Sequence, residues 1–220
     1  MLDPAPNPAV SIGDVATWTI AAAIWEIFEL SPEGITTAAV IRIGYYLGKA
    51  DPRSAKIVTY KSLLLCLVLS AALTTVFMVH SSDFIALFTN DENIAATLSD
   101  VVVLIGAGNC ANCIGNLAWT VLTVQSRPNI AAWIHGGVGI ALMSIPLGYV
   151  FTYVLQLDLT GLISAMVISQ ATVSAILLVF VFNSNWTKIC CRIISAHSGV
   201  SFDVKYDEEK GESKFLQLGS

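Results

Sequence analysis

The chain has 220 residues, of which 55% are hydrophobic and only 12% are charged, and its mean hydropathy is +0.71. A soluble globular domain has a charged share of about 25%, so the composition excludes that class and predicts a membrane protein. The net charge of −5, with five of the sixteen acids in the last eighteen residues, excludes a nucleic-acid-binding surface.

Five apolar runs follow one another along the chain. A helix that crosses the hydrocarbon core needs ~20 mostly apolar residues. We therefore predict an all-α fold, a polytopic transmembrane helix bundle with about five spans. The spans are expected near residues 15–47, 57–79, 94–124, 130–155 and 162–182 of a bundle that occupies 15–186. Segment 1–14 precedes the bundle, and residues 187–220 form a polar tail that we expect to be largely disordered.

The positive residues predict an orientation. Lys and Arg concentrate in loops on the cytoplasmic side of membrane proteins. Here all of them lie beside the first loop, in the third loop or after the last span, namely at Arg42, Lys49, Arg53, Lys56, Lys61, Arg127, Lys188, Arg192, Lys205, Lys210 and Lys214. We therefore expect an integral multi-pass protein with an extracellular segment 1–14 and a cytoplasmic C-terminus. The sequence does not distinguish the plasma membrane from an internal (vacuolar) membrane.

The first span contains three acids, Glu26, Glu29 and Glu33, at i, i+3 and i+7. This spacing places them on one helical face. A charged side chain in mid-membrane costs ~2.5 to 3.5 kcal/mol, so it usually faces a cavity. A carboxyl group in such a cavity can bind a proton and a cation alternately. The alternative is that Glu29 and Glu33 cap backbone groups near a helix break at Pro32, or lie outside the membrane.

The third span repeats this spacing with Asn109, Asn112 and Asn116. The three amides are candidates to line an aqueous cavity, and bonds between helices are an equal alternative. His135, early in the fourth span, is a candidate proton relay or a structural residue. With the three acids, these are the candidates for binding substrate and coupling ion. No catalytic or metal-binding motif is present, so we expect neither an enzyme nor a metal site.

The first span and its following loop also carry a motif of fixed spacing. Its residues are Pro32, Gly34, Ala38, Ala39, Arg42, Gly44, Leu47, Gly48 and Asp51. The motif resembles the repeated signature P-x-G-x-x-x-A-A-x-x-R-V-G-N-x-L-G-A-G-D of the multidrug and toxic compound extrusion (MATE) family. Tyr45 replaces the Asn of the signature and Ala50 its next Gly. Gly44 and Gly48 form a G-x-x-x-G step, which favours close helix packing.

This resemblance implies a transporter of about twelve helices in two lobes of six, with the signature on the second helix of each lobe. The five spans then correspond to most of the C-terminal lobe. The implied function is secondary active antiport, in which organic cations or xenobiotics are exported in exchange for H⁺ or Na⁺, with no other cofactor. The implied partners are the lipid bilayer, a small organic cation and the missing N-terminal lobe. The alternative is a non-transporting membrane remnant or an interaction subunit.

Overall fold

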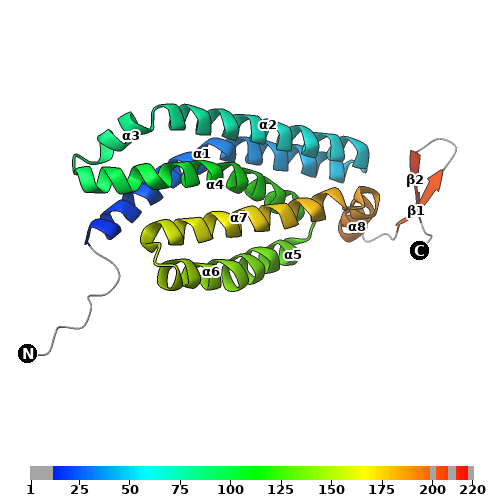
Figure 1. The fold of residues 1–220 in the computed structure, drawn as a ribbon. Coiled ribbons are helices and arrows are strands. Elements are labelled where there is room, and N and C mark those ends of the chain that lie inside the picture. The colour runs from blue at the N-terminus through cyan, green and yellow to red at the C-terminus, as the bar shows by residue number, and fades with distance from the viewer. Residues whose placement is uncertain (1–11, 199–201, 208–211, 218–220) are drawn as a thin grey trace, which may run out of the picture.

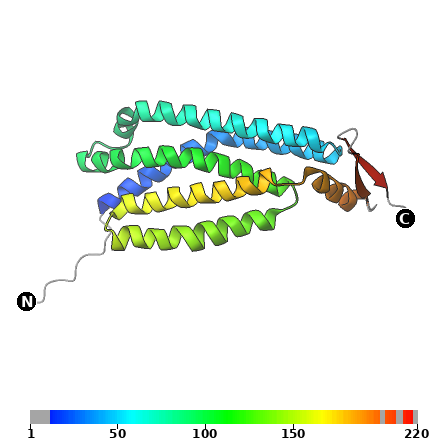
Figure 2. The same cartoon turned by 45° about the vertical axis from the view of Figure 1, so that its right-hand side comes forward.

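The computed structural model describes residues 12–198, 202–207 and 212–217, and it is a bundle of long helices that run side by side (Figures 1 and 2). This arrangement confirms the predicted all-α membrane fold. The helical elements are α1 (Ile12–Gly48), α2 (Pro52–Val79), α3 (Ser81–Phe88), α4 (Glu92–Val124), α5 (Pro128–Ala132), η1 (Trp133–Ser144), α6 (Ile145–Tyr149), η2 (Val150–Val154), α7 (Asp158–Phe182) and α8 (Trp186–Ser198).

The five long apolar runs of the sequence all become long helical segments. Four of these, Pro52–Val79, Glu92–Val124, Pro128–Val154 and Asp158–Phe182, are long and apolar enough to cross a membrane. The fifth is α1, whose 37 residues include acids in the middle of the helix. The sequence did not predict the eight-residue α3, which lies between α2 and α4, in the gap between the predicted spans 57–79 and 94–124.

The fourth span is a continuous helix with two π-helical stretches, η1 of twelve residues and η2 of five. η1 contains three glycines, at Gly136, Gly137 and Gly139, and ends just before Pro146. Glycine favours the helix weakly and proline has no N–H to donate, so regular α-helical bonding is weakened here. π-Helical turns occur frequently at functional sites, which makes this span a candidate for one.

α4 is the central helix of the bundle and packs against α1, α2 and α7. One buried cluster joins α4 to α1, α2, α7 and α8 around Ile43, Leu117 and Leu177. A second cluster joins the other half of α4 to α1 and α2 around Phe28 and Phe77, whose rings meet edge to face at 4.8 Å. α4 is therefore the scaffold against which the polar side chains of α1 are positioned.

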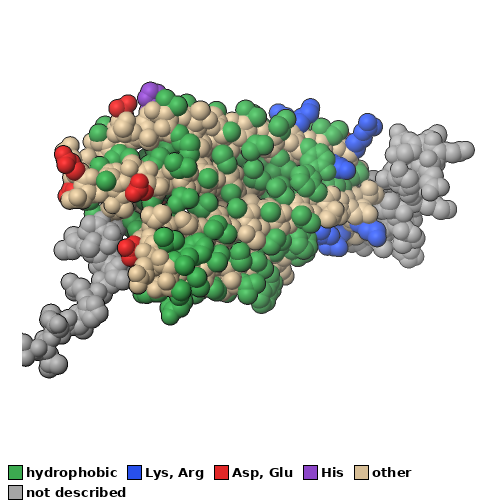
Figure 3. Space-filling view, in the orientation of Figure 1, with side chains coloured by type: hydrophobic (Ala, Val, Ile, Leu, Met, Phe, Trp, Pro, Cys, Tyr) green, Lys and Arg blue, Asp and Glu red, His purple; other side chains and the backbone are tan. Residues whose placement is uncertain are grey.

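On the face drawn in Figure 3, charged side chains lie at the two ends of the bundle. Lys and Arg gather where α1 ends and α2 begins and where α7 leads into α8, whereas Asp and Glu gather around α3 and the start of α4. At the acidic end His80 Nδ1 lies 3.5 Å from Asp83 Oδ2. On this face the surface between the two ends carries hydrophobic side chains and no charged ones, as a membrane-spanning bundle requires.

The segment 187–220, predicted as a polar tail, contains most of helix α8 and two short strands among its described residues. α8 buries Trp186, Ile189 and Cys190 against the end of the bundle and exposes Lys188 and Arg192. α8 forms because its apolar residues recur at helical spacing, a pattern that the average composition of the tail does not show. Beyond α8, strand β1 (Phe202–Asp207) pairs antiparallel with β2 (Glu212–Gln217), with Phe202 opposite Gln217. The predicted segment 1–14 lies almost entirely outside the described residues.

Candidate functional site: a groove between α1 and α4

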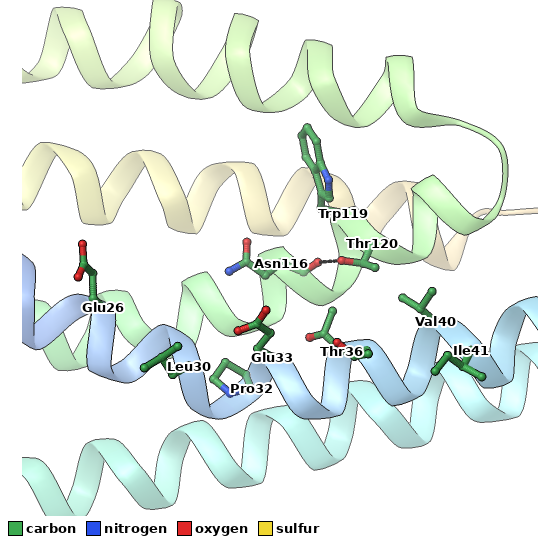
Figure 4. Close-up of a pocket in the computed structure, with 11 residues that line it drawn as sticks. Glu26, Leu30, Pro32, Glu33, Thr36, Val40, Ile41, Asn116, Trp119 and Thr120 are labelled. Atoms are coloured by element: carbon green, nitrogen blue, oxygen red, sulfur yellow. Dashed lines mark hydrogen bonds between the residues drawn. The ribbon is translucent and has the colours of Figure 1, made fainter.

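An open groove of about 720 Å³ lies between the middle of α1 and the second half of α4 (Figure 4). Small-molecule sites have volumes of about 300 to 1,000 Å³, so this groove is large enough for a drug-sized ligand. Its lining consists of Glu26, Leu30, Pro32, Glu33, Thr36, Thr37, Val40, Ile41, Asn116, Trp119 and Thr120.

α1 contributes the charge of the groove. Glu26 and Glu33 are both exposed to it, and Figure 4 shows them projecting from α1 to the same side. They are two helical turns apart, about 10 Å along the axis. Thr36 and Thr37 follow within the next turn. The predicted clustering is therefore present for these two acids, while the side chain of Glu29 lies outside the described residues.

Pro32 is buried within α1 and lies between the two acids in the chain. The helix continues through it but changes direction near this residue (Figures 2 and 4). Proline kinks a helix because it cannot donate the backbone hydrogen bond and its ring meets the preceding turn. The bend sets the angle between the half of α1 that carries Glu26 and the half that carries Glu33.

α4 contributes the polar and aromatic wall. Asn116 is exposed to the groove, and its backbone carbonyl accepts a 2.7 Å hydrogen bond from Thr120 Oγ1. Trp119 lies one turn along and meets the ring of His135 from η1 edge to face, with ring centroids 5.5 Å apart. His135 does not line the groove itself. It contacts the aromatic residue that does.

The other two asparagines of α4 form bonds between helices and do not line the groove. Asn109 Nδ2 donates to Thr74 Oγ1 of α2 at 2.9 Å. Asn112 Oδ1 accepts from Gln170 Nε2 of α7, also at 2.9 Å. Both asparagines are buried. Of the two roles that the spacing allowed, the structure places Asn109 and Asn112 in helix packing and Asn116 in the groove.

Glu26 also lines a second, smaller cavity of about 270 Å³ between α1, α4 and α7. Trp18 and Trp25 provide its aromatic surface, and Ile105, Ile163 and Met166 are among its apolar residues. The Glu26 carboxylate is therefore accessible from two neighbouring spaces. No other acid of the described residues lines both.

The signature residues of α1 divide into buried and exposed groups. Ala39 and Leu47 belong to the buried core, and Pro32 is also buried. Gly44 and Gly48 do not provide the close helix contact that their spacing predicted: a Cβ on Gly44 would lie 3.9 Å from Val124 Cγ1, and one on Gly48 would meet nothing within 4 Å. Both are exposed. The remaining exposed signature residues are Gly34, Ala38 and Arg42.

The turn between α1 and α2 explains the last part of the signature. The N–H of Asp51 donates to the Tyr46 carbonyl at 2.9 Å and that of Ala50 to the Leu47 carbonyl at 3.2 Å, which is the pattern of a Schellman cap. Ala50 has φ 58°, a conformation that favours glycine. Asp51 caps α2 by accepting from the Ser54 N–H at 2.9 Å, and hydrogen bonds from Ser54 lower the pKa of its carboxyl group.

The arrangement suits the binding of a cation. Two carboxylates, a carboxamide and an indole ring face one open space, and the described residues contain no group of three His, Cys, Asp or Glu that could hold a metal ion. Sequence reasoning did not single out Thr36, Thr37 or Thr120, nor the tryptophans of the second cavity. A signal was available for the first two, which lie three and four residues after Glu33 and share its face.

Comparison with known proteins identifies relatives of this chain. The MatE family model matches residues 10–154. Human multidrug and toxin extrusion protein 1 is 26% identical over 165 residues, which cover 74% of this chain and 29% of that protein. Protein DETOXIFICATION 35 of Arabidopsis thaliana is 24% identical over 155 residues, which cover 70% of this chain and 32% of that protein. The chain thus spans about a third of the length of these curated relatives.

The fold also matches a solved structure. The crystal structure of the eukaryotic MATE transporter AtDTX14 aligns with a TM-score of 0.81 and 17% sequence identity, over 87% of this chain and 42% of that one. At this identity the match shows a shared fold. The helices that carry the groove therefore have the same overall arrangement as part of that transporter.

Proposed function

Because this chain belongs to the MatE family, as its signature predicted, we propose that it forms part of a secondary active antiporter that exports organic cations and related xenobiotics in exchange for protons or sodium ions. The names of its relatives, which refer to multidrug and toxin extrusion, support the substrate class. The observation that carries the proposal is the pair of carboxylates, Glu26 and Glu33, in one groove of drug-sized volume.

Each side chain of the groove has a part in recognition. The carboxylates of Glu26 and Glu33 attract a positively charged ligand, more strongly in a membrane than in water because the surroundings are less polar. The indole of Trp119 offers a face to the same cation, a contact worth about 0.5 to 2 kcal/mol. Asn116 and the threonines give polar contacts that accommodate neutral parts of the substrate.

Exchange follows from the competition of two ligands for one carboxylate. A proton on Glu26 or Glu33 removes the negative charge that holds an organic cation, so protonation from the outer side favours release and deprotonation toward the cytoplasm favours reloading. A sodium ion would act by occupying the same oxygen atoms. The ring contact of His135 with Trp119 supports a role for His135 in positioning that indole.

We also propose the orientation that the charges indicate, with the basic end of the bundle and the C-terminus in the cytoplasm. Ser82 lies in α3 at the acidic end and Ser54 at the start of α2 at the basic end. Ser82→Cys should react with an impermeant thiol reagent applied outside intact cells, and Ser54→Cys should not. Labelling of Ser54→Cys alone would reverse the orientation.

Transport requires a second lobe in this proposal. In transporters built from repeats, the substrate site lies between the repeats. The 220-residue chain alone should therefore not move substrate in liposomes, whereas coexpression with an N-terminal lobe from a full-length relative should restore movement. Robust efflux by the chain alone would contradict the requirement for a second lobe. Failure of both preparations would favour a non-transporting membrane remnant or an interaction subunit.

The coupling role is tested with Glu26→Gln in the two-lobe assembly. Glutamine keeps the size of the side chain but cannot exchange a proton, so efflux of tetraethylammonium driven by a pH gradient should collapse while protein level and membrane insertion stay normal. Glu92→Gln is the matched control, because Glu92 lies at the acidic end outside the groove. An unchanged pH profile in Glu26→Gln would transfer the role to Glu29, Glu33 or the other lobe.

A further inference from the structure

A second groove, of about 410 Å³, lies between α1 and α2 and shares no lining residue with the α1–α4 groove. α1 contributes five residues and α2 contributes four. They are Gly34, Ile35, Ala38, Ala39, Arg42, Val58, Lys61, Ser62 and Leu65. The proposed transport function assigns no role to this space.

Two positive charges border this groove without a partner of opposite sign. Arg42 and Lys61 are exposed and lie toward the basic end of the bundle. Among the described residues neither of them forms a salt bridge, and no carboxylate lines the groove. The hydroxyl-bearing residue Ser62 lies next to Lys61 in the lining. The site therefore has the charge and the donors that a phosphate group requires.

The rest of the groove is apolar and runs along the helices. Gly34 precedes Arg42 by eight residues, about 12 Å along α1 and further into the bundle. A Cβ added to Gly34 would meet nothing within 4 Å, so the groove is open at that level. Ala38 and Ile35 form one wall and Leu65, 56% exposed, forms part of the other.

We propose that the α1–α2 groove is a binding site for an anionic phospholipid. Arg42 and Lys61 hold the phosphate, and one acyl chain lies along Ala38, Gly34 and Leu65. The long stems of Arg and Lys can extend toward the headgroup layer while their methylene groups cover apolar surface. Basic pockets between helices near the cytoplasmic leaflet, which is rich in anionic lipids, bind such headgroups. The site is independent of cation transport.

The apolar channel decides between a lipid and a soluble phosphate compound. A soluble anion would use only the basic rim, and the channel of Gly34, Ala38 and Leu65 would stay in contact with water or lipid tails. A phospholipid fills both parts at once. Arg42 and Lys61 in turn select a headgroup with net negative charge, such as that of phosphatidylserine, over a zwitterionic one, in which the ammonium group balances the phosphate.

Binding is measured on the purified 220-residue chain in detergent by native mass spectrometry, with phosphatidylserine and phosphatidylcholine as probes. Each basic residue near a membrane surface contributes about 1 kcal/mol, so Arg42→Gln/Lys61→Gln should weaken phosphatidylserine binding roughly 30-fold. The control Arg53→Gln/Lys56→Gln removes the same charge at exposed positions outside the groove and should weaken it less than about threefold. Equal losses of phosphatidylserine affinity in the two variants would overturn the assignment of the site to Arg42 and Lys61.

A second variant tests the channel. Ala38→Trp should fill it and reduce phosphatidylserine binding, but leave the weak binding of soluble glycerophosphoserine unchanged. Circular dichroism and size-exclusion chromatography check that each variant is folded. Equal affinity of the wild type for glycerophosphoserine and phosphatidylserine would overturn the lipid assignment in favour of a soluble anion. Equal affinity for phosphatidylserine and phosphatidylcholine would overturn the role of the two charges.

Discussion

The two sides of α4 use polar residues in opposite ways. Toward α7, Asn112 accepts a hydrogen bond from Gln170, and Ser174 Oγ donates to the Ala111 carbonyl at 2.7 Å. Toward the middle of α1, Asn116 faces an open groove with two exposed carboxylates. Polar groups within a membrane need partners. The first side finds them in the protein, and the second leaves them available to a ligand.

Close helix approach produces the packed side. A Cβ on Gly115 would overlap Ser174 Oγ and lie 3.2 Å from Gln170 Nε2, so only glycine lets α7 come this near. On the groove side the helices leave an open space instead. α1 bends near Pro32, and the two acids on either side of this bend line the space beside α4. Polar residues at the same spacing therefore bond to a neighbouring helix where helices touch, and line an open groove where they separate.

The largest expected difference concerns thiol reactivity. Cys190 is fully buried where α8 packs on the bundle, and burial raises the pKa of its thiol from 9.0 to about 12. The thiolate is the reactive form, so N-ethylmaleimide at pH 8 should modify Cys190 roughly a thousand-fold more slowly than an ordinary thiol. Peptide mapping should show rapid labelling of Thr37→Cys in the groove. Comparable labelling rates at both positions would contradict the packing of α8.

The same shift predicts a pH dependence of stability. Because the folded chain holds the Cys190 proton more tightly than the unfolded chain, this stabilisation is complete below pH 9 and is lost as the pH rises toward 12. Cys190→Ser should lose this dependence in denaturant titrations of the chain in detergent. An unchanged alkaline profile in that variant would assign the loss of stability to other groups.

Adding one methyl group where α4 packs against α7 and one in the open α1–α2 groove should give effects of opposite sign. Gly115→Ala displaces the Ser174 hydroxyl from the Ala111 carbonyl and should destabilise the chain by about 1 to 3 kcal/mol. Gly34→Ala meets open space and should stabilise it by up to about 1 kcal/mol, the gain in helix propensity. Thermal unfolding in detergent measures both. Similar shifts for the two variants would contradict the close approach of α7 at Gly115 or the open space at Gly34.

The asparagines allow the same comparison without a change in backbone. Asn112→Leu leaves the amide of Gln170 without its acceptor and should cost about 1 to 2 kcal/mol of stability. Asn116→Leu should change stability by less than about 0.5 kcal/mol, because this side chain faces the groove. It should instead weaken ligand binding. A larger loss of stability for Asn116→Leu would place that residue in the core.

The α1–α2 turn, which lies outside both sides of α4, should affect stability alone. Ala50 adopts a left-handed conformation that costs a non-glycine residue about 1 kcal/mol. Ala50→Gly should therefore stabilise the chain by about that amount, with no change in ligand binding. Asp51→Asn should keep the cap on Ser54, whereas Asp51→Ala should lose about 1 kcal/mol. Destabilisation by Ala50→Gly would exclude the Schellman cap.

The sequence alone was enough to predict the long helices and the face of α1 that lines the groove. The apolar runs located the five long helical segments because hydrophobic length is set by the membrane itself. The spacing of Glu26 and Glu33 placed both on one face, and they line one groove. These features depend on residues near one another in the chain, which is why the sequence alone reveals them.

Features that depend on a neighbouring helix could not be read in this way. Spacing made Asn109, Asn112 and Asn116 equivalent, and only the position of α2 and α7 separates them. The outward position of Gly44 and Gly48 likewise depends on which faces of α1 are covered. The π-helical bonding of η1 has no periodic signal in the sequence, although its glycines indicate a weak helix.

Cation binding by the α1–α4 groove through its two carboxylates is tested most directly by equilibrium binding of tetraphenylphosphonium to the purified 220-residue chain in detergent. We predict saturable binding, with at least about a tenfold loss of affinity in Glu26→Gln/Glu33→Gln. Glu92→Gln should bind as the wild type does. Equal affinity in the double variant and the wild type would contradict the assignment of the groove.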